Sequence, residues 1–176
     1  MDRAHFHIGD RPTDGAARPM GVSFLAALLG FGLVAGPAFG QDYPLPPPSG
    51  PLPQLSPPAL VRIVGVTTKR GARVTRLTVR APVGATVVSR CISKTKKHCP
   101  YSQRIIPVTG SVGSRTIHVK GFERTFRAGV VLRLYVVKAG RTGKFTSFTI
   151  RLRKTPLRRD RCVSGITLTP VGCPSG

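Results

Sequence analysis

The sequence predicts an all-β domain, and three observations support this fold class. From residue 60 onward, short runs rich in Val, Ile, Thr and Phe follow one another, separated by turns that contain Gly or Pro. Several runs alternate apolar and polar side chains, as in residues 129–137, where the even-numbered positions are all apolar. In this part of the sequence, no stretch of a dozen residues has the apolar spacing of a helix.

We expect about seven strands, each bounded by turn residues, at 60–67, 73–80, 85–92, 103–108, 115–120, 129–137 and 144–153. Short strands separated by about 8–12 residues are typical of a small immunoglobulin-like β-sandwich, and a small barrel is the second candidate. The predicted core consists of inward-facing apolar residues: Ile63, Val74, Leu77, Val79, Val87, Ile105, Ile117, Phe126, Leu132, Leu134, Phe145, Phe148 and Ile150.

An apolar export helix is expected before the domain. Residues 20–39 carry no charge, and Ala38-Phe39-Gly40 fits the small-residue pattern of a signal-peptide cleavage site. We expect cleavage after Gly40, and the alternative is an uncleaved anchor, because about 20 apolar residues can span a bilayer. No basic residue follows until Arg62, which places the rest of the chain outside the cytoplasm. The protein is therefore predicted to be secreted, held in the cell envelope, or anchored by a single pass with its C-terminus outside.

A proline-rich linker is expected between the export segment and the domain. Residues 43–58 contain eight prolines in sixteen positions, and proline disfavours both helix and sheet. We interpret the segment as a stiff or disordered spacer, and recognition by a proline-binding module is the alternative. The predicted organisation has four parts: a signal peptide or uncleaved anchor (1–40), a Pro-rich disordered spacer (41–59), an immunoglobulin-like β domain (60–155) and a disulfide-closed tail (156–176).

All four cysteines, Cys91, Cys99, Cys162 and Cys173, lie after the export segment, and an even number outside the cytoplasm favours disulfides. Four cysteines allow three pairings, and closeness in sequence favours Cys91 with Cys99 and Cys162 with Cys173. Each short loop would contribute about 2–3 kcal/mol to stability in the chain-entropy description. A metal site is the weaker alternative, because Cys91, His98 and Cys99 lack zinc-finger spacing. No metal and no cofactor are expected.

The net charge of +22 in 176 residues is the strongest functional signal, because it favours anionic partners. Removal of residues 1–40 would take away three arginines and three aspartates, so this net charge would not change. One basic cluster, Lys69 to Arg76, surrounds the first turn of the domain. Two further clusters supply the candidate anion-binding residues: Lys94, Lys96, Lys97, Arg151, Arg153, Lys154, Arg158, Arg159 and Arg161. The alternative is a solvated basic face that only reflects composition.

Catalytic patterns are scarce in this sequence. After residue 40 the acidic residues are Asp42, Glu123 and Asp160, and the two histidines are His98 and His118. Neither a G-x-S-x-G nor a G-x-x-x-x-G-K-[ST] motif is present. We interpret Glu123 and Asp160 as ion-pair partners of neighbouring basic residues. We therefore expect no enzyme and no catalytic residue.

Charge and export together define the expected function. We expect a non-enzymatic structural or interaction module of the cell envelope, whose partners are anionic envelope polymers or envelope proteins. The alternative is a secreted cationic protein that binds wall polymers, acidic polysaccharide or nucleic acid. Nucleic acid is the least favoured ligand, because export removes it from reach and no aromatic stacking platform is evident. Membrane contact is expected only through residues 20–39, if they are not cleaved.

Four segments carry a resemblance to a group of proteins: Cys91 to Cys99-Pro100, GFERTFRAGVVLRLYV (121–136), GRTGKFTSFTIR (140–151) and RRDRC (158–162). Together they resemble an uncharacterised domain that recurs in exported bacterial proteins. There, a Cys-to-Cys-Pro loop precedes an F-x-x-x-[LF]-x-x-G turn, a G-x-x-G-[KR]-[FY] hairpin and an Arg-rich D-R-C segment. The resemblance covers about residues 60–162. It implies a small immunoglobulin-like domain outside the cytoplasm, with no catalytic residues to carry over.

Overall fold

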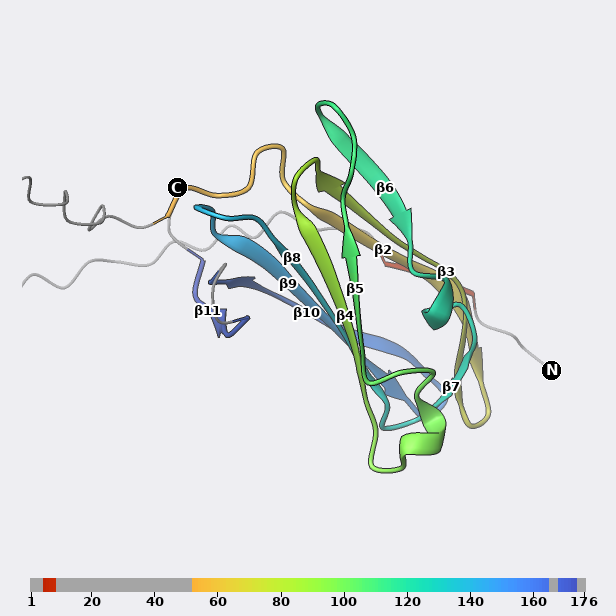
Figure 1. Cartoon of the computed structure of the whole chain (residues 1–176). Coiled ribbons are helices and arrows are strands. Elements are labelled where there is room, and N and C mark those ends of the chain that lie inside the picture. The colour runs from red at the N-terminus through yellow and green to blue at the C-terminus, as the bar shows by residue number, and fades with distance from the viewer. Residues whose placement is uncertain (1–4, 9–51, 165–167, 174–176) are drawn as a thin grey trace, which may run out of the picture.

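Two antiparallel β-sheets pack face to face in the computed structural model, which describes residues 5–8, 52–164 and 168–173 (Figure 1). The first sheet has the order β1 (His5–Ile8), β2 (Leu60–Thr68), β3 (Gly71–Pro82) and β6 (Ser114–His118), and β7 (Thr125–Arg127) also pairs with β3. The second has the order β11 (Pro170–Val171), β10 (Lys154–Val163), β9 (Gly143–Arg151), β8 (Val131–Val137), β4 (Thr86–Ile92) and β5 (Gln103–Pro107). Two short 3-10 turns are η1 (Lys96–His98) and η2 (Lys120–Phe122).

The all-β prediction is confirmed, since the structure is 61% strand and 4% helix in a β-sandwich-like arrangement. Each of the seven predicted strands coincides with an observed strand to within two residues at either end. Strands β1, β7, β10 and β11 were not predicted. The long β10 has the sequence KTPLRRDRCV, in which charges and a proline hide the apolar alternation. It pairs with β9 and continues to Val163, beyond residue 155, which is the predicted end of the β domain.

The core lies between the sheets and is formed by inward-facing residues of both. Most of the predicted core residues lie there, including Leu77, Leu134 and Phe148, each with none of its surface exposed. The prediction for Ile105 is wrong, because its side chain is 60% exposed. Strand β5 alternates, so the next residue, Ile106, packs against the core while Ile105 faces outward.

A second, smaller apolar cluster lies on the outer face of the second sheet. It consists of Val88, Tyr135, Phe145 and Val163, and Leu168 of the C-terminal segment packs against it. Phe145 is therefore buried as predicted, but outside the main core. This cluster gives Leu168 an apolar surface on the second sheet to pack against.

Part of the expected spacer contacts the domain. Leu55 and Ala59 are buried in the main core. Thr142 in the β8–β9 turn donates two hydrogen bonds, from its backbone N to the Pro53 carbonyl (2.9 Å) and from its Oγ1 to the Leu52 carbonyl (2.8 Å). Apolar side chains between the prolines therefore hold residues 52–59 against the sandwich.

The N-terminal strand β1 pairs with β2 and buries Phe6, which is 6% exposed. It belongs to the segment that the sequence predicts to be removed, and cleavage after Gly40 would leave β2 at the sheet edge. The expected cleavage site, residues 20–39 and the first part of the spacer lie outside the described residues. No helix within the described ranges is long and apolar enough to cross a membrane.

Candidate anion-binding surface

The strand register brings several basic turns to one end of the sandwich. β4 ends at Ile92, which lies opposite Val131 at the start of β8. Val131 in turn lies opposite Thr149, near the end of β9. The loop that follows β4 and the turn that follows β9 therefore emerge at the same end of the second sheet.

The first sheet contributes its own turn to this end. The Ala128 backbone N donates to the Arg70 carbonyl (2.9 Å), which ties the β2–β3 turn to the segment after β7. The next residue, Gly129, donates to the Ile150 carbonyl of β9 (2.9 Å). Two backbone hydrogen bonds thus hold turns of both sheets side by side.

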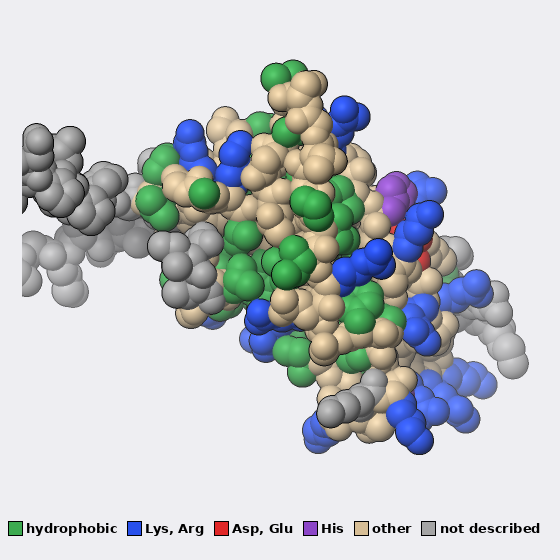
Figure 2. Space-filling view, in the orientation of Figure 1, with side chains coloured by type: hydrophobic (Ala, Val, Ile, Leu, Met, Phe, Trp, Pro, Cys, Tyr) green, Lys and Arg blue, Asp and Glu red, His purple; other side chains and the backbone are tan. Residues whose placement is uncertain are grey.

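Exposed Lys and Arg side chains crowd this end, which lies at the bottom of Figure 1. We define the cationic end by the exposed basic residues of these turns: Lys69, Arg70, Lys94, Lys97, Arg127, Arg153 and Lys154. Figure 2 shows basic side chains gathered there, whereas carboxylates are almost absent from the face in view. The Lys96 side chain lies outside what the structure describes. The described chain offers no ion-pair partner to any residue of the cationic end.

Arg153 is held in a backbone conformation that arginine rarely adopts. It follows Leu152 in the two-residue turn between β9 and β10, and its φ is 51°. This left-handed conformation costs a non-glycine residue about 1 kcal/mol, whereas glycine adopts it freely. The sequence therefore keeps a cationic side chain at the tip of this turn against the preference of its backbone.

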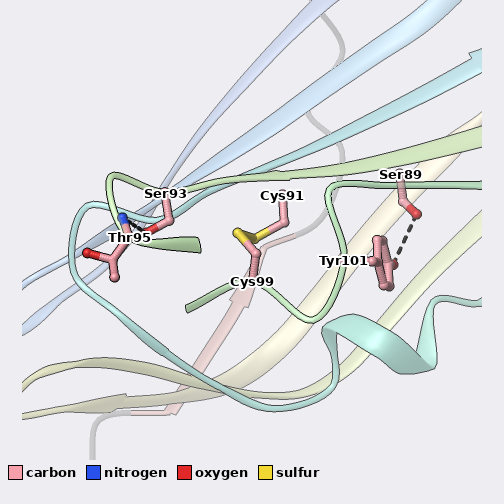
Figure 3. Close-up of a disulfide and its surroundings, with 6 residues drawn as sticks. All are labelled: Ser89, Cys91, Ser93, Thr95, Cys99 and Tyr101. Carbon is pink, nitrogen blue, oxygen red and sulfur yellow. Dashed lines mark hydrogen bonds between the residues drawn. A yellow bond between two sulfur atoms is a disulfide. The ribbon is translucent and has the colours of Figure 1, made fainter. Parts of the chain in front are cut away.

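A disulfide fixes the loop that carries Lys94 and Lys97. Cys91 at the end of β4 is bonded to Cys99, eight residues later, and Cys91 is buried in the main core (Figure 3). Within the loop, the Thr95 backbone N donates to Ser93 Oγ (3.4 Å). The predicted pairing is confirmed here, and the disulfide ties the lysines to the core of the sandwich.

Tyr101, two residues after Cys99, anchors the end of the loop, and Figure 3 shows it beside Ser89 of β4. Its hydroxyl lies 3.0 Å from Ser89 Oγ, which is fully buried, and its ring stacks on Phe122 with 5.1 Å between centroids. A Cβ at Gly121 would collide with the same ring, so glycine is required there. Burial raises the pKa of the Tyr101 phenol above its usual value, against the opposing effects of Ser89 and Arg104.

The second disulfide, Cys162–Cys173, is also paired as predicted. Cys173 lies eleven residues after Cys162 in the sequence. β11 of the segment between them pairs with the end of β10. Leu168 of the same segment packs on the outer apolar cluster. This disulfide therefore holds a cover on the second sheet and not a basic loop.

Arg158 has an internal role that the sequence analysis missed. Its side chain is 9% exposed, its Nε donates to Asp160 Oδ2 (2.6 Å), and its Nη1 donates to the Val61 carbonyl of the opposite sheet (2.9 Å). The guanidinium also lies 5.7 Å from the centre of the Phe148 ring. Arg158 therefore joins the two sheets, which speaks against its predicted use for a ligand.

The Asp160 carboxylate is satisfied within the fold, as the ion-pair interpretation expected. Besides Arg158, Thr146 Oγ1 donates to its Oδ1 (2.6 Å). Burial alone would raise the pKa of Asp160, but the hydrogen bonds from Arg158 and Thr146 outweigh it and lower this pKa below its usual value.

Glu123 has partners other than arginine. Its Oε1 accepts a hydrogen bond from the Leu77 backbone N (3.2 Å), and it lies 3.7 Å from His118 Nδ1. The carboxylate fills a gap in the β3 ladder between the residues that pair with β7 and those that pair with β6. Both carboxylates of the described residues therefore have structural partners.

The remaining predicted residues are divided between two places. Arg151 lies next to the cationic end, where its Nε donates to the Thr155 carbonyl (2.9 Å). Arg159 and Arg161 are exposed on β10, opposite Ser147 and Phe145 of β9. Lys69 and Arg70 form a basic cluster in the sequence that lies outside the predicted site, and Arg127 belongs to none of the predicted clusters. Only the pairing of β7 with β3 brings these residues beside the β9–β10 turn.

A separate pocket of about 400 Å³ opens between β5 and β6. Its lining mixes apolar side chains, among them Ile106, Val108 and Ile117, with polar groups, and Arg115 is its one charged lining residue. The pocket lies between the edge strands of the two sheets, apart from the turns of the cationic end.

Comparison of the chain with protein-family models, with curated proteins and with solved structures gives no match. The structure itself supports a β-rich, sandwich-like domain with two disulfides. The immunoglobulin-like identity and the resemblance to an exported bacterial domain stay predictions.

Proposed function

We propose that this protein is an exported, non-enzymatic module of the cell envelope that binds anionic envelope polymers through its cationic end. The observation that carries the proposal is the convergence of basic turns from both sheets on one surface. None of the seven residues of that surface is neutralised by a described carboxylate.

The geometry of the cationic end favours a polymer over a small ligand. Its charges stand on separate turns of a rigid scaffold, so they present many weak sites over a broad surface. Each contact with an anion would be screened over about 8 Å at physiological salt. A chain with many anionic groups compensates for this screening, because several contacts form in one binding event.

An extracytoplasmic location is compatible with the two disulfides, which persist in oxidising compartments. The uncharged residues 20–39 and the resemblance of residues 60–162 support export. The Pro-rich segment before the domain supports a spacer that leads to the sandwich, with its last residues packed on the domain. Together these features favour retention outside the cytoplasm.

A binding role without catalysis is the simplest use of these side chains. Glu123 and Asp160 are engaged in the fold, and all four cysteines are paired. The unpaired groups on the cationic end are cations, which attract anions but do not by themselves supply an acid–base pair.

The proposal is tested with the full chain, both disulfides formed, mixed with isolated cell-wall sacculi. One set of sacculi keeps its anionic polymers and a second set is stripped of them, and the bound fraction is measured from low to high salt. We expect binding that requires the polymers and decreases steeply as salt increases. Binding that is equal on stripped sacculi, or no binding at low salt, would contradict the proposal.

A pair of matched variants locates the binding surface. The Lys94→Gln and Lys97→Gln double variant removes two charges from the cationic end, and Arg62→Gln with Arg141→Gln removes two exposed charges elsewhere. Both variants have the same net charge. We expect the first to lower the bound fraction much more than the second, and equal losses would show that only the overall charge matters.

A further inference from the structure

A row of arginines crosses the outer face of the second sheet, away from the turns of the cationic end. In the strand register, Arg90 of β4 lies opposite Arg133 of β8, Arg133 lies opposite Ser147 of β9, and Ser147 lies opposite Arg159 of β10. Neighbouring strands are about 4.8 Å apart, so Arg133 is about 5 Å from Arg90 and about 10 Å from Arg159 along this row.

The row lies on the same outer face of the second sheet as the small apolar cluster. Arg90 and Arg133 are each two residues from a member of that cluster on the same strand, Val88 and Tyr135. Alternation places residues two apart on one face of a sheet. The side chains of the row therefore project from the same outer face of the second sheet as that cluster.

Arg90 is held in place before any ligand arrives. Its Nε donates to Gln103 Oε1 (2.7 Å), and its guanidinium lies 5.4 Å from the centre of the Tyr135 ring. These contacts fix the plane of the guanidinium and leave its two terminal nitrogens for other acceptors. A preorganised arginine loses less side-chain entropy when it binds an anion.

Two features of the row are unfavourable without a ligand. Arg90 and Arg133 are like charges directly opposite each other, an arrangement that destabilises a sheet. Ser147 is only 8% exposed, and its hydroxyl has no hydrogen-bond partner among the described residues. A buried hydroxyl without a partner is also unfavourable. An anion between the arginines would relieve both, because its negative charge offsets the repulsion between the two cations and it accepts a hydrogen bond from the hydroxyl.

We propose that the row of Arg90, Arg133, Ser147 and Arg159 binds phosphate groups of an anionic polymer. A phosphate presents more acceptor oxygens than one guanidinium can use, so it suits two adjacent arginines and a hydroxyl. A carboxylate has two oxygens, which a single guanidinium fork satisfies. The ligand class rests on the proposed function, but the site is a different surface from the cationic end.

The test measures binding of inorganic tripolyphosphate to the full chain by titration calorimetry at low salt. Arg133→Gln should weaken binding about tenfold, because it removes a charge-assisted hydrogen-bond donor from the centre of the row. Ser147→Ala should weaken it about fivefold without any change in net charge. Arg62→Gln, an exposed arginine on the other sheet, should change it less than about twofold.

Three outcomes would overturn the inference: binding of both row variants within about twofold of the unaltered chain, an equal loss for Arg62→Gln, or no binding of tripolyphosphate at all. Circular dichroism checks the fold of each variant, and Arg159→Gln at the exposed end of the row replaces Arg133→Gln if that variant unfolds. Failure of sacculus binding with intact tripolyphosphate binding would reject the proposed function alone, and the reverse pattern would reject the row alone.

Discussion

The two disulfide-closed segments use the same covalent bond in different surroundings. Cys91 is buried in the main core, and the loop that it closes with Cys99 carries exposed lysines to the cationic end. Cys173 is exposed, and Leu168 of the segment that it closes with Cys162 packs on the outer apolar cluster. The first disulfide positions charge on a rigid base, and the second holds a cover over apolar side chains.

Basic residues near the two segments also differ in their partners. Lys94 and Lys97 of the first loop have no ion-pair partner in the described structure. Arg158, close to the second disulfide in sequence, is almost fully buried and joins the sheets through Asp160 and the Val61 carbonyl. Basic residues that look alike in the sequence therefore divide into those that hold the fold together and those that remain available for an anion.

Removal of each disulfide in turn should give the largest difference in stability between the two segments. Loop closure alone gives nearly equal stabilisation, about 2.5 kcal/mol for sequence separations of 8 and 11, with slightly more for the longer loop. Burial of Cys91 adds lost packing, so Cys91→Ala with Cys99→Ala should lower the free energy of unfolding by about 3–4 kcal/mol. Cys162→Ala with Cys173→Ala should lower it by less than about 2 kcal/mol, because the freed segment can detach locally and regain its entropy.

Denaturant unfolding of both double variants measures this difference. Quenching of tyrosine fluorescence by a soluble quencher adds a local readout, since only the second variant should make Tyr135 accessible while the core remains folded. A larger loss of stability in the second variant would show that loop length, and not burial, decides the contribution of each disulfide.

Asp160→Asn should have the next largest effect, because Arg158 would lose its charged partner in a nearly buried place. We expect a loss of about 2 kcal/mol at neutral pH. The folded carboxyl has a lowered pKa, so its contribution is present above the usual value of 3.8 and is lost as pH falls through the lower, folded pKa. Stability measured from pH 6 to pH 2 should therefore decline less steeply in the variant, and parallel curves would contradict the assignment.

Tyr101→Phe and Tyr135→Phe form a matched pair across the two regions. Tyr101 shares a hydrogen bond with the fully buried Ser89, so its hydroxyl should contribute about 1 kcal/mol. Tyr135 is buried under the C-terminal segment, and its hydroxyl has no partner among the described residues. Its replacement should change the free energy of unfolding by less than about 0.5 kcal/mol. Thermal unfolding of both variants is the measurement, and equal effects would remove the distinction.

The smallest effect on stability is expected at the cationic end. Lys94→Gln with Lys97→Gln removes exposed charges that contact no described carboxylate, so the free energy of unfolding should change by less than about 0.5 kcal/mol. Any increase would reflect relief of repulsion between like charges. A loss above about 1 kcal/mol would mean that these lysines serve the fold, and would weaken their assignment to ligand binding.

Local patterns were sufficient to predict much of the fold. Alternation and turn residues located seven strands, and short separations indicated both cysteine pairs, because each of these features depends on neighbours in sequence. Strand β10 is not predictable from its own sequence, because its charged residues are stabilised by pairing with β9 and not by alternation of apolar and polar side chains. Ile105 was assigned to the core because an isolated apolar pair does not show which member faces inward on an edge strand.

The candidate site was less predictable, because it depends on contacts between distant segments. The sequence identified Lys94, Lys97 and Arg153 by local charge density, but Arg127 joins them only through pairing of β7 with β3. The same charge density included Arg158, whose internal role requires Asp160 and the Val61 carbonyl. The arginine row was invisible in the sequence, since its four members come from four strands.

The most direct test of the central claim is the salt dependence of binding to isolated anionic wall polymer. The full chain, the Lys94→Gln and Lys97→Gln variant, and the Arg62→Gln and Arg141→Gln control are titrated over a range of salt. The salt slope is the change in the logarithm of the binding constant with the logarithm of the salt concentration, and each cation that contacts the polymer makes it steeper. The loop variant should therefore reduce the magnitude of this slope by about two, and the control should leave it almost unchanged. Identical slopes for the two variants would contradict a binding surface at the cationic end.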